Sequence, residues 1–138
     1  LQVAGELPLE GCSVSPFIPG EATPLAREPV GALDTALNCM AALRLLRPEL
    51  VIPAVSALNL TGADDGYRRG LRAGANLCTI NLTPTEMRGD YLLYKRERFI
   101  MNEERVLNAI AAEGLEVSPT GMTEYWPAKP ALAEAMAG

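Results

Sequence analysis

The chain has 138 residues, of which 49% are hydrophobic, and it carries a formal net charge of −5. This size and composition suit a single domain with its own core, and the scattered Lys and Arg residues argue against a phosphate-binding surface for nucleic acid or anionic membranes. No apolar run approaches the roughly 20 residues of a membrane-spanning helix and the start carries no secretory signal, so we expect a soluble cytoplasmic protein.

The first residues, LQVAGELPLEG, have the pattern of a helix end followed by a loop. Because the chain starts at Leu1 and not at Met, we expect a piece of a longer protein, although removal of a tag would give the same start. The first predicted strand covers Gly11–Pro19. The strand-to-helix loop after it is longer than the usual length of about 2 to 6 residues, and long loops at this position usually carry function.

The strongest helix signal follows, over Ala32–Leu46. Leucine and methionine recur there at spacings of 3 and 4 residues, and Ala36, Ala41 and Leu46 widen the same apolar stripe. Pro48 prevents the helix from continuing. We therefore expect one face of this helix to be buried against a sheet.

A strand, a helix and a second strand are predicted next. The strands are the apolar runs Leu50–Val55 and Leu77–Leu82, which have strand length and the composition of buried parallel strands. The helix between them has Asp64 and Asp65 in its first turn and ends at Gly74, a residue suited to a left-handed C-cap. Because Pro53 cannot donate a ladder hydrogen bond, its strand lies at an edge, bulges there, or begins at Pro53.

The segment that follows is irregular and contains a cationic cluster at Lys95, Arg96 and Arg98. Glu97 lies within this cluster, so we interpret it as a solvated face in preference to an anion-binding site. Residues 122–138 form a carboxyl-terminal tail with the only tryptophan.

The last predicted helix covers Glu103–Glu113, with Asn102 as its N-cap and Gly114 as its C-cap. Its apolar residues are expected to point inward; they are Val106, Leu107 and Ile110.

This order of elements predicts an α/β fold of three successive βα units with parallel strands. Functional loops are then expected at the carboxyl ends of the strands. Three strands cannot close a barrel. Two alternatives follow: the chain is the last part of a (βα) barrel, or it forms a small open sheet whose edge needs a partner.

Small polar residues on the predicted strands are the candidate binding site. Ser13 and Ser15 share one side of the first strand, and the other candidates, on the next two strands, are Ala57 with Asn59 and Thr79 with Asn81. The other interpretation is that they satisfy nearby backbone groups at strand ends. No residue is assigned a catalytic role, and the absence of histidine excludes Ser-His and Cys-His pairs within this chain.

The cysteines give no sign of a metal site. Cys12, Cys39 and Cys78 lie far apart in the sequence, without chelating spacing, and we interpret them as small buried hydrophobic residues. Gly70 and Gly74 fall within and after a helix, so close packing and a C-cap explain them better than a phosphate loop does.

Three motifs carry a family resemblance, in the order SPFIPGEATPLA, RLLRPELVIPAVSAL, and GLRAGAN with NLTPT. Together they resemble the carboxyl-terminal part of the radical S-adenosylmethionine enzymes of the biotin and thiamin synthesis-associated group. That group includes biotin synthase, methylornithine synthase and a hydrogenase H-cluster maturase. The resemblance covers about Gly11 to Gly121, so we assign residues 1–121 to the last βα units of a TIM-type barrel.

The resemblance implies that the chain is part of a barrel enzyme. The full-length enzyme would use S-adenosylmethionine and a [4Fe-4S] cluster to generate a 5′-deoxyadenosyl radical. The family's cluster motif, CxxxCxxC, is missing from this chain, so we expect neither cofactor on this chain alone. Biotin synthase has an arginine near the position of Ala57 that serves an auxiliary cluster, and its absence here puts biotin-type sulfur insertion in doubt.

Two functions follow as hypotheses. In the first, the chain is the substrate-side barrel wall of a radical enzyme of cofactor or amino-acid biosynthesis, completed by an amino-terminal barrel half. In the second, it is a stand-alone, non-catalytic α/β domain that binds a small molecule or another chain, with a homo-oligomer as the expected state.

Overall fold

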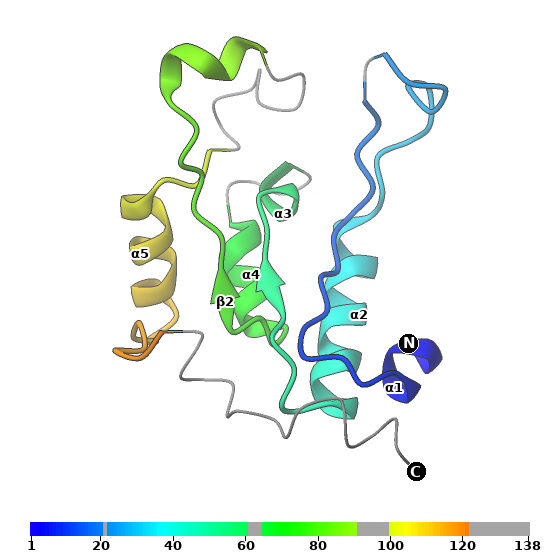
Figure 1. The fold of residues 1–138 in the computed structure, drawn as a ribbon, viewed down its shortest axis with the longest axis vertical. Helices are drawn as coiled ribbons and strands as arrows, with labels where there is room; N and C mark the ends of the chain where they lie inside the picture. The colour runs from blue at the N-terminus through cyan, green and yellow to red at the C-terminus, as the bar shows by residue number, and fades with distance from the viewer. Residues whose placement is uncertain (21, 61–64, 91–99, 122–138) are drawn as a thin grey trace, which may run out of the picture.

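The computed structural model describes residues 1–20, 22–60, 65–90 and 100–121. Figure 1 shows a mixed α/β arrangement in which the extended segments lie in front of α2 and α4, with α5 beside β2. In chain order the elements are α1 (Gln2–Glu6), α2 (Leu33–Leu46), β1 (Pro53–Ala54), α3 (Ala57–Leu60), α4 (Gly66–Arg72), β2 (Leu77–Cys78), the 3-10 helix η1 (Thr85–Asp90) and α5 (Glu103–Ala112).

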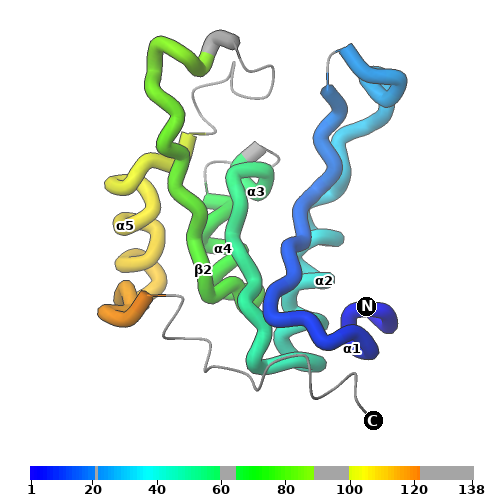
Figure 2. Tube along the Cα trace, viewed as in Figure 1, coloured from blue at the N-terminus to red at the C-terminus, as the bar shows by residue number. Residues whose placement is uncertain are grey.

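The sheet is parallel. β1 and β2 pair with Pro53 opposite Leu77. The segment that precedes α2 adds an isolated parallel bridge between Gly11 and Val51, where the backbone N–H of Cys12 donates to the carbonyl of Val51 at 2.9 Å. Three chain segments thus run side by side in their sequence order, as the trace in Figure 2 shows.

The regular strands are shorter than predicted. Gly11–Pro19 contains one bridge residue and is otherwise extended without ladder pairing, and two prolines within it lack the N–H that a ladder needs. β1 begins at Pro53, which was one of the three predicted alternatives. The α/β class is confirmed, whereas the three complete βα units and the barrel stay predictions.

Helix α2 starts within one residue of its predicted position, and it carries the predicted apolar stripe. Met40 has no exposed surface and Leu43 only 2%, and both belong to the main core cluster. Leu46 was predicted to widen the stripe, but it is 57% exposed. The error lies in the last turn, where the helix ends before Arg47 and Leu46 faces away from the sheet.

The connection from α4 to β2 depends on two glycines. A side chain at Gly70 would lie 2.9 Å from Leu58 Cδ1, so α4 approaches α3 closely there. Gly74 ends the helix with a φ of +107°, a conformation that favours glycine, and its carbonyl accepts a hydrogen bond from Arg44 Nε at 2.9 Å. The predicted roles of both glycines, close packing and a left-handed cap, are confirmed.

Helix α5 begins and ends as predicted, within one residue. The Asn102 side chain accepts from the backbone N–H of Arg105 at 2.9 Å, and Gly114 has a φ of +68°. Val106 is buried, but Leu107 is 45% exposed and was wrongly predicted to point inward. Val106 and Ile110, which are four residues apart, pack in or against the core cluster, whereas Leu107 lies on a side of the helix that is only partly covered.

Two arginines tie α4 to α5. Glu113 accepts from Arg68 Nε at 2.6 Å and from Arg72 Nε at 2.5 Å. These hydrogen bonds, that of Arg72 first, lower the pKa of Glu113, and the bond to Glu113 raises the pKa of Arg72. The pair of charge-assisted contacts therefore favours the ionised carboxylate at the end of α5.

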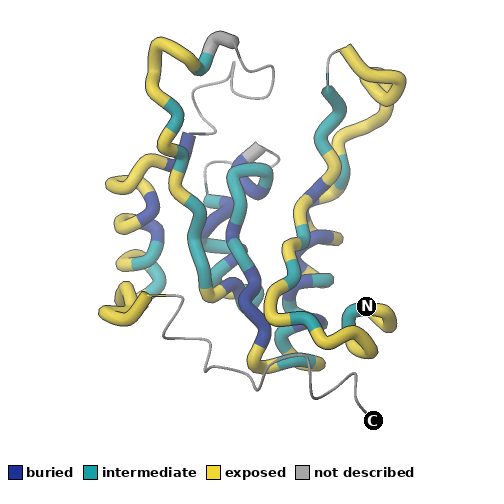
Figure 3. Tube along the Cα trace, in the orientation of Figure 1, coloured by how far each residue is buried: buried dark blue, intermediate teal, exposed yellow. Residues whose placement is uncertain are grey.

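Figure 3 shows that burial follows the inner sides of the helices and the sheet segments. The core cluster joins α2, β1, α3, α4 and α5, and among its members Leu50 and Ile52 have no exposed surface. At the amino-terminal end, Arg47 donates to the carbonyls of Leu7 and Leu9 at 3.1 and 3.2 Å.

None of the helices in the described ranges is long and apolar enough to cross a membrane.

Candidate functional site

A polar pocket of about 230 Å³ lies where β1 and β2 end. The carboxyl ends of parallel strands are the usual position of ligand sites in α/β folds, because loops diverge there. Residues from the ends of both strands, from α4 and from the segment before α5 line the pocket; they are Ser56, Tyr67, Thr79, Ile80, Asn81, Leu82, Thr83 and Met101.

One wall of this pocket is fixed by a tyrosine from α4. The Tyr67 side chain is almost fully buried, and its hydroxyl donates to the carbonyl of Thr79 at 2.9 Å. The same hydroxyl lies 2.8 Å from Thr79 Oγ1, which in turn donates to the carbonyl of Ala54 at 3.3 Å. The end of β2 is therefore held to both α4 and β1 by polar contacts.

The other polar groups of the pocket come from the segments that follow the strands. Asn81 Oδ1 accepts from the backbone N–H of Thr83 at 2.8 Å, which fixes the orientation of the Asn81 amide. The Asn81 Nδ2 atom and the hydroxyls of Ser56 and Thr83 make no hydrogen bond within the described ranges. They line the pocket with hydrogen-bonding capacity that a ligand can use.

The structure brings two of the predicted site residues together, Thr79 and Asn81. Ser13 and Ser15 lie on the extended segment before α2, where both are exposed, and they do not line this pocket. Their proposed role in binding stays a prediction.

Ala57 and Asn59 were predicted on a strand, and this placement is wrong because they lie on the short helix α3. Asn59 is 2% exposed; its Oδ1 accepts from the backbone N–H of Tyr67 at 3.1 Å and its Nδ2 lies 2.8 Å from Met101 Sδ. Its side chain therefore satisfies a backbone group at the start of α4, in line with the alternative interpretation.

Six of the described lining residues were not predicted from the sequence: Ser56, Tyr67, Ile80, Leu82, Thr83 and Met101. Ser56 and Thr83 are small polar residues just after predicted strands, so the rule that selected Thr79 would have found them. Tyr67 carries no such signal, because it reaches the pocket through a contact between α4 and the end of β2.

The cysteines do not fit an iron–sulfur cluster. Cys12, Cys39 and Cys78 are all partly buried, and no group of three His, Cys, Asp or Glu residues in the described ranges can hold a metal ion. Burial raises the pKa of the Cys78 thiol, which favours the protonated form over the thiolate that metals require. The predicted cationic cluster at residues 95–98 and the tail from 122 onward lie outside the described residues.

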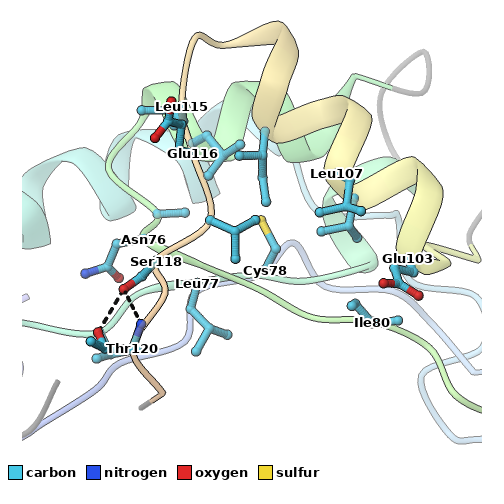
Figure 4. Close-up of a pocket in the computed structure, with 16 residues that line it drawn as sticks. Asn76, Leu77, Cys78, Ile80, Glu103, Leu107, Leu115, Glu116, Ser118 and Thr120 are labelled. Carbon is cyan, nitrogen blue, oxygen red and sulfur yellow. Dashed lines mark hydrogen bonds between the residues drawn. The ribbon is translucent and has the colours of Figure 1, made fainter. Parts of the chain in front are cut away.

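A second, mainly apolar hollow of about 600 Å³ lies between β2, α5 and the segment 115–120. Figure 4 shows Leu77, Ile80 and Leu107 around it, with Glu103 and Glu116 also in its lining. Ser118 closes a local turn in the same wall, where its hydroxyl accepts from the backbone N–H of Thr120 at 3.2 Å. The exposed side of Leu107 on α5 faces this hollow.

No protein-family model matches the chain. Two curated proteins are similar to it in sequence. The [FeFe] hydrogenase maturase subunit HydE of Thermotoga maritima is 41% identical over 81 residues, which are 59% of this chain and 23% of that protein. The 3-methylornithine synthase of Methanosarcina acetivorans is 35% identical over 111 residues, 77% of this chain and 30% of that protein.

Both relatives are radical S-adenosylmethionine enzymes. The chain is therefore related to radical S-adenosylmethionine enzymes. It spans less than a third of the length of either relative.

Proposed function

We propose that the chain is the carboxyl-terminal portion of a radical S-adenosylmethionine enzyme and forms the substrate-side wall of its TIM-type (βα) barrel. The observation that carries this proposal is the 35% identity over 111 residues to 3-methylornithine synthase, together with 41% over 81 residues to HydE. The names of these relatives favour cofactor or amino-acid biosynthesis as the setting, and a cytoplasmic location fits such a role.

The parallel order of the three sheet segments supports the same proposal. Gly11 lies beside Val51, and β1 lies beside β2, so each segment neighbours the next in the sequence. Neighbours in sequence order, joined by helices α2 and α4, are the arrangement found in (βα) barrels. Residues 1–121 are then the last βα units, and residues 122–138 are the tail.

In this proposal the polar pocket at the strand ends belongs to the substrate side of the barrel. Its residues position a small-molecule substrate and exclude water, while the cofactors supply the bond-breaking chemistry. Because the cysteines here do not fit a cluster, the [4Fe-4S] cluster and the main S-adenosylmethionine site are assigned to the amino-terminal portion of the full-length enzyme.

The apolar hollow along β2 and α5 supports the proposal that a further portion of the protein packs against this chain. Leu77 of β2 and Leu107 of α5 face a hollow of about 600 Å³, and apolar surface of this kind is usually covered. We assign its cover to the amino-terminal portion of the same barrel, whose first strand would follow β2 around the sheet.

The test is to sequence the reading frame upstream of Leu1 and to purify the native gene product without oxygen. We expect a CxxxCxxC motif upstream, iron binding after reconstitution, and formation of 5′-deoxyadenosine from S-adenosylmethionine. Alanine variants of the motif cysteines are the control and should abolish both iron binding and 5′-deoxyadenosine. A native product that lacks the motif and binds no iron contradicts the proposal.

The same apolar hollow also favours a second candidate, a stand-alone α/β domain that binds a small molecule or a second chain. This candidate predicts a native product of 14.7 kDa per chain that forms a stable oligomer without iron. Native mass spectrometry separates the two candidates, because only the first predicts a chain several times longer than this one.

A further inference from the structure

We infer that the polar pocket at the ends of β1 and β2 binds an uncharged group rich in hydroxyls or amides in preference to a carboxylate or a phosphate. The inference rests on the proposed function, since it names the kind of substrate group that this wall of the barrel receives.

Three side chains that line the pocket, from two chain segments, carry polar atoms without a hydrogen-bond partner in the part of the chain that the structure describes. Ser56 follows β1, and Asn81 and Thr83 follow β2. Asn81 offers the two N–H donors of its amide, because its oxygen is already bound to the backbone N–H of Thr83 at 2.8 Å. The two hydroxyls both donate and accept. This set matches a ligand with several neutral oxygen or amide groups.

The other two polar side chains of the lining, those of Thr79 and Tyr67, already contact each other. Thr79 Oγ1 lies 2.8 Å from the Tyr67 hydroxyl and 3.3 Å from the carbonyl of Ala54. These contacts hold the end of β2 rigid, so the free donors of Asn81 and Thr83 keep their positions when a ligand binds. A rigid, preformed set of donors loses little conformational entropy on binding.

Among the described residues that line the pocket, none carries a formal charge at neutral pH. None of the described arginines is part of the lining: among those near it in the sequence, Arg68 donates to Glu113, Arg88 to the carbonyl of Thr83 at 2.9 Å, and Arg105 to the carbonyl of Ile100. A carboxylate or phosphate placed in the pocket would lose hydration without gaining a lining cation, which is strongly unfavourable. A neutral group loses less hydration and gains the same hydrogen bonds.

The test uses the native gene product labelled with ¹⁵N only at asparagine, so that the Asn81 side-chain amide reports on the pocket. The variant Asn81→Leu assigns its signal, and the Asn59 amide, buried outside the lining, serves as an internal control. The probes are two matched pairs: ribose with ribose 5-phosphate, and N-acetylalaninamide with N-acetylalanine. In each pair only the second member carries a negative charge.

We expect at least one neutral probe to shift the Asn81 signal saturably, with an affinity that does not change between low and high salt. Its charged counterpart should bind at least about fivefold more weakly. Ser56→Ala and Thr83→Val should each weaken the neutral probe about fivefold, the effect of one lost hydrogen bond. Ser118→Ala, which removes a hydroxyl from the other hollow, should leave the affinity unchanged.

Tighter, salt-sensitive binding of a charged member overturns the inference, and loss of that binding in Arg88→Gln or Lys95→Ala would identify the cation responsible. Failure of both neutral probes to shift Asn81 overturns it as well. The outcome is separate from the proposed function: a gene product that binds the neutral probe at Asn81 but forms no 5′-deoxyadenosine refutes the proposed function alone.

Discussion

The hydroxyl of Tyr67, on helix α4, donates to the carbonyl of Thr79 at 2.9 Å and lies 2.8 Å from its side-chain hydroxyl. The tyrosine is 1% exposed, so both hydrogen bonds form away from bulk water. This contact connects the helix layer to the end of β2, where the candidate pocket lies. It makes the pocket geometry dependent on a residue that a ligand does not have to touch.

The first prediction concerns this contact. Tyr67→Phe keeps the ring but removes the hydroxyl that contacts the carbonyl and the side chain of Thr79, so we expect the free energy of unfolding to fall by about 1 to 2 kcal/mol in urea titrations. Thr79→Val should cost a similar amount, and the double variant should cost less than the sum because the two residues share one interaction. Fully additive effects would contradict the coupling.

The second prediction concerns the approach of α4 to α3. A Cβ atom at Gly66 would lie 2.2 Å from the carbonyl oxygen of Leu58, a clash with backbone that no rotamer relieves. We expect Gly66→Ala to lower the free energy of unfolding by more than about 2 kcal/mol. Gly5→Ala is the control, since a Cβ in α1 meets nothing within 4 Å and should be neutral or stabilising by up to about 1 kcal/mol. Equal effects would contradict this packing.

The third prediction compares two apolar residues of α2. Met40 has no exposed surface, whereas Leu45 is 84% exposed. Met40→Ala should lower the free energy of unfolding by about 2 to 5 kcal/mol, because it leaves a cavity between the helix and β1. Leu45→Ala should change it by less than about 0.5 kcal/mol. Thermal unfolding of the two variants measures the difference, and a large effect at Leu45 would indicate a covered surface there.

The fourth prediction is a pH dependence at Glu113. Arg72 and Arg68 lower the pKa of this carboxyl in the folded chain. Its contribution to stability is therefore present above the unfolded pKa and is lost as the pH falls through the lower, folded pKa. Chemical unfolding of wild type and Glu113→Gln should show a difference at pH 7 that shrinks steadily toward pH 3. A difference that stays constant with pH would exclude the carboxylate as its source.

The helices were predictable because their signals are local. Pro48 and the leucine spacing placed α2, and the Asn102 and Gly114 caps placed α5, within one residue of the observed ends. Gly74 has the predicted positive φ for the same reason. Such features depend on residues a few positions apart, so the sequence alone carries them.

The strands and the pocket were less predictable because they depend on distant contacts. The run from Leu50 onward continues as apolar sequence into α3, and a short apolar run does not distinguish strand from helix. The Asn59 side chain is buried and accepts a hydrogen bond from the backbone N–H of Tyr67, eight residues later in the chain. The periodicity of a helix or a strand does not predict such a contact. Thr79 and Asn81 were predicted as a pair, but Tyr67 enters the site from another element.

The hydrogen bonds from Arg47 to the amino-terminal segment have a practical consequence for protein engineering. One guanidinium donates to the carbonyls of Ala4, Leu7 and Leu9, at 3.4, 3.1 and 3.2 Å, and so clasps the turn between α1 and the first sheet segment. Lysine has no planar fork with which to reach three acceptors. Arg47→Lys would therefore remove part of the polar attachment of the amino-terminal segment and leave its packing on the core through Ala4 and Leu9, so a fusion partner at Leu1 would be held less firmly.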